Sequence, residues 1–96
     1  MEAREMLDQL VLLAREAGLE VREMRGTAAG EGGLAALSGI CRVQDRFWVM
    51  LAESDSPEAR IEVLADALVT HAAAFLESRY LPPAIRQRLG EVSGAA

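Results

Sequence analysis

The sequence predicts an α+β fold: a helix, a small three-stranded sheet that contains a hairpin, a long helix and a short C-terminal helix. Two observations carry this prediction. Apolar residues recur at helical spacing over residues 2–17 and 57–78, whereas residues 19–25 and 46–52 form shorter runs that are typical of strands. Only two helices are long, so we expect them to cover one face of the sheet and to leave the other face open.

The N-terminal segment fits one amphipathic helix over residues 2–17. Its apolar side chains gather on one broad face, and Gly18 follows where a left-handed C-terminal cap belongs. Leu12 is the exception, because it falls on the polar side of the helix between Asp8 and Arg15. We therefore expect an exposed leucine that is a candidate contact point for a partner.

Three short segments are expected to form the sheet. Residues 19–25 alternate apolar and polar side chains, while residues 39–43 and 46–52 flank a two-residue turn as a hairpin does. The second hairpin strand is apolar on both faces: Phe47, Val49 and Leu51 on one, Trp48 and Met50 on the other. Such a strand is either covered on both sides or leaves an apolar patch exposed. We expect the second set to lie on the uncovered face, together with Met24 from the first strand.

The connection before the hairpin is rich in glycine. Residues 26–38 contain four glycines and are expected to form a flexible connection or, alternatively, a loop that edges a cleft. Cys41 follows in the middle of a strand, where we expect a buried and inert thiol. It is the only cysteine, so no intrachain disulfide is possible.

The long helix has a clear start. Ser56 is a typical N-cap residue, and Pro57 follows in the first turn. The helix is expected to continue to about Ser78 and to bury a stripe of residues: Ile61, Leu64, Leu68, Ala72 and Phe75. On the opposite side lies a set of polar and acidic residues that is typical of a solvated surface.

Two adjacent prolines, Pro82 and Pro83, end the long helix because neither can continue it. Residues 84–89 are then expected to form a last short helix. We interpret residues 1–89 as a single domain and residues 90–96 as a disordered tail.

The charge pattern restricts the possible partners. The net charge is −5, and all ten basic residues are arginines scattered among fifteen acids. Nucleic acids and anionic membranes both attract concentrated positive charge, so the sequence argues against both partners. The N-terminus is too acidic for a signal peptide, and no apolar run is long enough to span a membrane. We expect a cytoplasmic protein with no cofactor.

Several short phrases occur in the order found in a known family. Residues 14–21 read A-R-E-A-G-L-E-V, residues 64–70 read L-A-D-A-L-V-T, and residues 80–83 read Y-L-P-P. In this order the chain resembles the ImmA/IrrE group of zincin-type metallopeptidases, whose active helix reads L-A-H-E-L-x-H where this chain has residues 64–70. The resemblance spans most of the chain and implies a zincin-like α+β scaffold.

The residues that perform the chemistry of that family are replaced in this chain. The resemblance puts Asp66 at the first zinc-ligand position, Ala67 at the position of the general base and Thr70 at the second ligand position. Alanine cannot accept a proton, and threonine is a poor zinc ligand. His71 comes one residue late, about 100° away around the helix. The resemblance therefore implies a degenerate relative without catalytic residues or a metal site.

The uncovered face of the sheet is the strongest candidate binding surface. Tryptophan and methionine are enriched where proteins contact each other. We expect the surface to contain Trp48, Met50 and Met24, with Arg42 and Arg46 as its polar rim. The alternative is that another element buries these side chains.

Three functions are compatible with these features. The first is a non-catalytic protein-interaction or oligomerisation module that binds a protein partner or itself, as a homodimer. The second is a small acidic adaptor, or a dimer like a secretion chaperone, that binds an extended segment of a client protein. The third is an active metallohydrolase that uses Asp66, His71 and Glu77 in an unusual geometry, although it would lack the general base.

Overall fold

The computed structural model describes residues 1–24 and 38–93. In chain order its elements are α1 (Ala3–Glu16), β1 (Glu20–Met24), β2 (Gly39–Val43), β3 (Arg46–Ala52), α2 (Pro57–His71), α3 (Ala73–Glu77) and α4 (Pro83–Ser93). The α+β class predicted from the sequence is confirmed. The expectations for residues 25–37 and 94–96 lie outside the described residues.

The sheet has β3 at its centre, with β1 parallel to it on one side and β2 antiparallel on the other. β2 and β3 form the predicted hairpin. Gln44, the first of the two turn residues, has a φ of 56°, as the turns that match the twist of a hairpin require. The register pairs both Glu20 and Cys41 with Trp48, so these three side chains belong to one face of the sheet.

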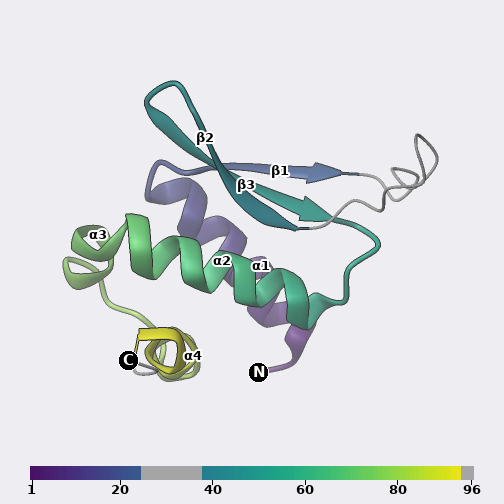
Figure 1. Cartoon of the computed structure of the whole chain (residues 1–96). Helices are drawn as coiled ribbons and strands as arrows, with labels where there is room; N and C mark the ends of the chain where they lie inside the picture. Colours follow the sequence, from purple (N-terminus) through teal and green to yellow (C-terminus); the bar gives the residue numbers. More distant parts are fainter. Residues whose placement is uncertain (25–37, 94–96) are drawn as a thin grey trace.

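The described helices all lie on the same side of the sheet (Figure 1). α1 and α2 pack against each other beneath it, and α4 packs against α2. The largest fully buried side chains come from all of these layers: Leu10, Val49, Ile61, Leu64, Leu68 and Ile85. Because α2 is covered by the sheet, by α1 and by α4, it also buries Ala65 and Ala67, which lie outside the predicted stripe.

The long helix expected over residues 57–78 is interrupted. α2 begins as predicted, with the Ser56 side chain as its N-cap, but it ends at His71. Ala72 leaves the helical region, with a φ of −136° and a ψ of 29°, and the five-residue α3 follows. Alanine is the best helix former, so the local sequence carries no sign of this break. The change of direction brings Phe75 against the edge of the core, where it is half-buried.

The C-terminal helix is longer than expected. α4 begins at Pro83, whose fixed φ suits a first helical turn, and continues to Ser93. The sequence predicted a helix over residues 84–89 followed directly by a tail. Leu89 is buried and Val92 is partly buried against the core, which accounts for the extra turn. None of the helices within residues 1–24 and 38–93 is long and apolar enough to cross a membrane.

Two hydrogen bonds tie the start of β2 to the segment before α2. The Ser38 N–H donates to Asp55 Oδ2 at 2.9 Å, and the Ser38 hydroxyl accepts from the Ala52 N–H at 2.9 Å. The backbone hydrogen bond from Ser38 lowers the pKa of Asp55 below its usual value of 3.8, and the side chain of the same serine adds to the effect. Ionised Asp55 therefore helps to hold Ser38, just before β2, against the connection that leads from β3 into α2.

A lowered folded-state pKa stabilises the fold above the unfolded value, and this contribution is lost as the pH falls through the folded value. We therefore expect the free energy of unfolding to decrease below pH 3.8, with a shallower decrease in Asp55→Asn than in the wild type. Urea denaturation at a series of acidic pH values measures both slopes. Asp45→Asn, in the hairpin turn, is the matched control. Equal slopes in the wild type and Asp55→Asn would contradict the role of this carboxylate.

Leu68→Ala removes a fully buried side chain from the middle of the core. We expect it to lower the free energy of unfolding by about 2–5 kcal/mol, because it loses transfer energy and leaves a cavity. Leu12→Ala is the control, since Leu12 is 56% exposed and its truncation should change stability by less than about 0.5 kcal/mol. Circular dichroism during urea denaturation measures both. Similar losses in the two variants would show that this core assignment is wrong.

Candidate functional site

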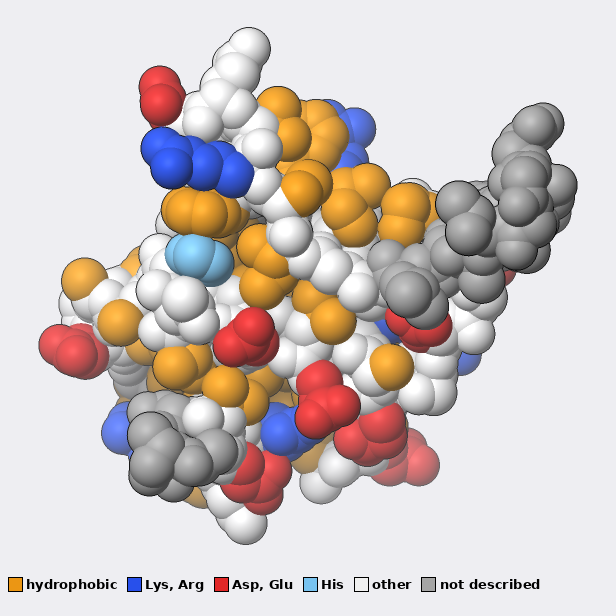
Figure 2. All heavy atoms as spheres, in the orientation of Figure 1, with side chains coloured by type: hydrophobic (Ala, Val, Ile, Leu, Met, Phe, Trp, Pro, Cys, Tyr) orange, Lys and Arg blue, Asp and Glu red, His pale blue; other side chains and the backbone are white. Residues whose placement is uncertain are grey.

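The face of the sheet opposite the helices is left uncovered by every element of the described chain (Figure 1). The strand registers place these side chains on it: Glu20, Arg22, Met24, Cys41, Val43, Arg46, Trp48 and Met50. We call this set the open face. Hydrophobic side chains are exposed along this side of the molecule (Figure 2). A solvated sheet face is normally polar, so its apolar centre makes this surface a candidate binding site.

Trp48 lies at the centre of the open face and is half-buried. The guanidinium carbon of Arg22 is 4.7 Å from the centroid of its ring. Arg22 Nε in turn donates to Glu20 Oε2 at 2.8 Å, and Arg46 Nη2 lies 3.8 Å from Glu20 Oε1. A cation–π contact at an exposed site contributes about 0.5–1 kcal/mol. The indole is therefore capped by a cation that a neighbouring carboxylate holds in position.

The structure brings together most of the predicted contact residues. Four of them share the open face: Trp48, Met50, Met24 and Arg46. Arg42 does not, and the expectation for it is wrong. Its register partner is Phe47, which places Arg42 on the helix-facing side, with its guanidinium carbon 6.0 Å from the Phe47 ring. Successive side chains of a strand point to opposite faces of the sheet, so Arg42 lies on the face opposite to that of its neighbour Cys41.

Leu12 is exposed, as predicted, but it lies on α1 and therefore on the helix side of the sheet. There it borders a separate groove of about 290 Å³ together with Tyr80, which is 77% exposed. Arg79 Nη1 at the rim of this groove pairs with Glu16 Oε1 at 2.6 Å. Leu12 thus does not contribute to the open face.

Cys41 is exposed, whereas the sequence predicted a buried thiol. β2 is an edge strand of the described sheet, and only its helix-facing side chains reach the core. Ile40 is one of these and is half-buried. The Cys41 side chain points to the open face, so it stays accessible.

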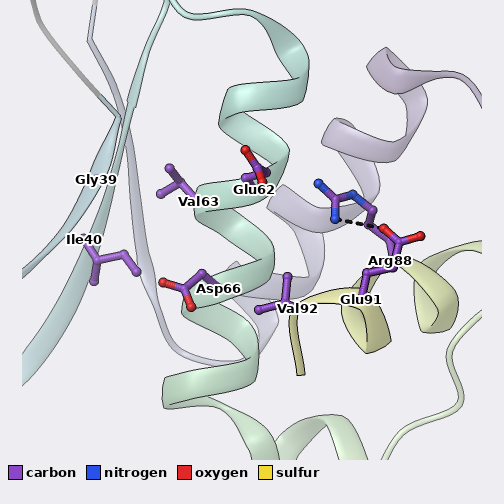
Figure 3. A pocket seen from close by; sticks show the side chains of 8 residues that line it. All are labelled: Gly39, Ile40, Glu62, Val63, Asp66, Arg88, Glu91 and Val92. Carbon is purple, nitrogen blue, oxygen red and sulfur yellow. Dashed lines mark hydrogen bonds and ion pairs between the residues drawn. The ribbon is translucent and has the colours of Figure 1, made fainter. Parts of the chain in front are cut away.

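A groove of about 660 Å³ lies between the edge strand β2 and the helices α2 and α4 (Figure 3). Its apolar side chains come from all three elements: Ile40, Val63 and Val92. Its carboxylates are those of Glu62, Asp66 and Glu91. Arg88 Nη1 donates to Glu91 Oε1 at 3.1 Å, whereas Glu62 and Asp66 have no cationic partner among the described residues. The groove therefore combines an apolar lining with unneutralised negative charge.

The positions that match the zincin-type active helix are divided between two sides of α2. Asp66 is exposed in the groove and accepts a hydrogen bond from Thr70 Oγ1 at 3.3 Å. Ala67, in contrast, is fully buried in the core. The side of α2 that faces the groove thus carries a carboxylate and a hydroxyl.

The residues of the hypothetical metallohydrolase are not brought together. The His71 ring stacks on Phe47, with ring centroids 3.7 Å apart and an angle of 18° between the planes. Glu77 lies on α3, beyond the helix break, while Asp66 faces the groove. Within residues 1–24 and 38–93 there is no group of three or more histidine, cysteine, aspartate or glutamate side chains that could hold a metal ion.

None of the known protein-family models, curated proteins or solved structures matches this chain significantly. The resemblance to the ImmA/IrrE group therefore stays a prediction from short sequence phrases. The geometry of the sites described above is what supports a function.

Sequence reasoning missed two contacts of these sites. Arg22, which caps Trp48, was detectable in part, because the alternation along its strand puts it on the same face as Met24. Its approach to Trp48 follows only from the parallel pairing of β1 with β3. The stack of Phe47 on His71 had no sequence signal, since it depends on how the sheet is positioned over α2.

Acrylamide quenching tests the exposure of the indole, because Trp48 is the only tryptophan. We expect dilute wild-type protein to be quenched readily. Arg22→Ala should raise the quenching rate constant, because it uncovers one side of the ring. Arg86→Ala, on α4, should leave it unchanged. A rate constant typical of a fully buried tryptophan, or one that Arg22→Ala does not alter, would refute the arrangement of the open face.

Proposed function

We propose that this chain is a non-catalytic protein-interaction module of the cytoplasm and that the open face is its contact surface. One observation carries the proposal: Trp48 and Met50 lie on a face of the central strand that no described element covers, with Arg22 stacked on the indole.

The chemistry of the open face suits a protein partner. Tryptophan and arginine dominate the energetics of many interfaces, and methionine adapts its shape to the opposing surface. A partner that covers Trp48 would remove the remaining exposed part of the indole from water. The guanidinium of Arg22 is weakly hydrated, and its charge is already paired with Glu20. Covering Arg22 and Glu20 together therefore buries a paired charge, whereas Arg46, which shares the same carboxylate, leaves one positive charge for the partner to match.

The same arrangement offers little for acid–base catalysis. The only carboxylate of the open face is Glu20, which two arginines contact. On α2, the position that the resemblance assigns to a general base is Ala67, which is buried in the core on the other side of the helix from the groove. These features favour binding over hydrolysis.

Self-association and binding of a different protein are two forms of this function. The dependence of the molecular mass on protein concentration separates them. A module that pairs with itself forms oligomers whose fraction rises with protein concentration. An acidic adaptor keeps its mass until its client is added. Sedimentation of the pure protein over a range of concentrations therefore distinguishes an oligomerisation module from an adaptor.

Trp48→Glu tests the open face directly. We expect it to raise the dissociation constant of assemblies that use this face at least about tenfold, because loss of a central tryptophan typically costs 2 kcal/mol or more. Sedimentation measures this effect for self-assembly. Affinity purification from cell extract with wild-type and variant bait measures it for a client.

Tyr80→Glu is the matched control, because it introduces the same charge at an aromatic residue that is 77% exposed and lies outside the open face. It should retain every assembly that Trp48→Glu loses. Circular dichroism establishes that both variants are folded. If both behave like the wild type in both assays, the open face is not the contact surface.

A further inference from the structure

We propose that two copies of this chain pair through the outer edge of β2, the free edge, which pairs with no other strand of residues 1–24 and 38–93, so that their three-stranded sheets join into one continuous six-stranded sheet. This inference goes beyond the proposed function, because the contact is the edge of the sheet and Trp48 stays uncovered. The partner is a second copy, for reasons of hydrogen bonding, register and charge.

Hydrogen bonding is the first reason. Val43 and Arg46 close the hairpin across its two-residue turn, where the carbonyl of the first residue accepts from the N–H of the last. Hydrogen-bonded and non-hydrogen-bonded pairs alternate along an antiparallel ladder. Ile40 and Arg42 therefore direct their N–H and C=O groups away from β3, towards the free edge. Such an edge is a template for a further strand.

Register is the second reason. When two copies of β2 overlap fully about a two-fold axis, Ile40 lies opposite the partner's Arg42. The residues whose N–H and C=O groups point to the free edge therefore pair with each other. Cys41 then lies opposite the partner's Cys41 in a non-hydrogen-bonded pair, with a Cα–Cα distance of about 4.5 Å. Disulfides span Cα–Cα distances of about 4.4–6.8 Å. Both thiols point to the open side of the joined sheet, where Cys41 is accessible.

Charge complementarity is the third reason. Arg42 points to the helix-facing side, and Ile40 lines the groove between β2, α2 and α4. In the proposed register the partner's Arg42 lies beside Ile40, and its guanidinium would enter this groove. The carboxylates of Glu62 and Asp66 lie there without an ion-pair partner among the described residues, because Arg88 in the same groove pairs with Glu91 (Figure 3).

The shape of the groove fits an arginine side chain. Its aliphatic stem can pack on Ile40 and Val63 while the charged head reaches the carboxylates. By symmetry the contact forms twice in each dimer. This local attraction offsets the repulsion between two chains that each carry a net charge of −5.

Thiol oxidation tests the register. With diamide as the oxidant, two thiols each give up one proton and one electron and form one S–S bond. Cys41 is the only cysteine, so every disulfide-linked dimer joins it to the partner's Cys41. We expect rapid conversion of the wild type to a linked dimer on a non-reducing gel. The Arg42→Pro variant keeps Cys41 but has no backbone N–H at position 42 to bond the second copy. Its conversion to the linked dimer should therefore slow at least about tenfold.

A charge exchange tests the groove. Arg42→Asp should raise the dimer dissociation constant measured by sedimentation at least about tenfold, because it places like charges together. The double variant Arg42→Asp with Asp66→Arg reverses both partners and should restore the dimer. Arg86→Asp is the control, since it makes the same change at an exposed arginine of α4 that belongs neither to the open face nor to the groove. Circular dichroism checks that each variant is folded.

The outcomes separate this proposal from the proposed function. A dimer that is lost in Arg42→Pro and retained in Trp48→Glu supports pairing through β2. A dimer that is lost in Trp48→Glu and retained in Arg42→Pro would show that the copies meet through the open face, which overturns the edge contact while supporting the proposed function. A wild type that stays monomeric at all concentrations and oxidises no faster than Arg42→Pro also overturns it.

Discussion

The pairing of β3 with both of its neighbours is the interaction on which the rest of the structure depends. Its backbone bonds β1 on one side and β2 on the other, while Val49 and Leu51 are buried against the helices. The helical layer covers only one face of the sheet. Trp48 and Met50, which alternate with Val49 and Leu51 along β3, therefore have no helix above them. The open face is thus a direct result of an apolar central strand in a sheet with a single helical layer.

Local signals allowed most of the elements to be predicted, but not the faces of the edge strand. The hairpin, the start of α2 and the left-handed Gly18 follow from nearby residues, and all three agree with the structure. Cys41 was misassigned because its burial depends on which strand lies at the edge of the sheet, whereas Arg42 was misassigned although the two-residue turn already pairs it with Phe47. The break at Ala72 was invisible in the sequence, since three adjacent alanines favour an unbroken helix.

The open face and the proposed dimer edge are continuous with one another through β2. Antiparallel pairing about a two-fold axis perpendicular to the sheet keeps both open faces on the same side, so the apolar area available to a third protein would double. On the opposite side, the unpaired carboxylates of α2 would be neutralised by arginines from the second copy.

The parallel pairing of β1 with β3 has a consequence for the order of folding. β2 and β3 are joined by a two-residue turn, whereas β1 must close a much longer stretch of chain before it can pair. Loop closure costs entropy before the distant contacts repay it, so the hairpin should form earlier than the β1 contacts. Arg22 reaches the indole only through this late pairing, which makes the tryptophan an internal reporter of the last step in which the sheet is completed.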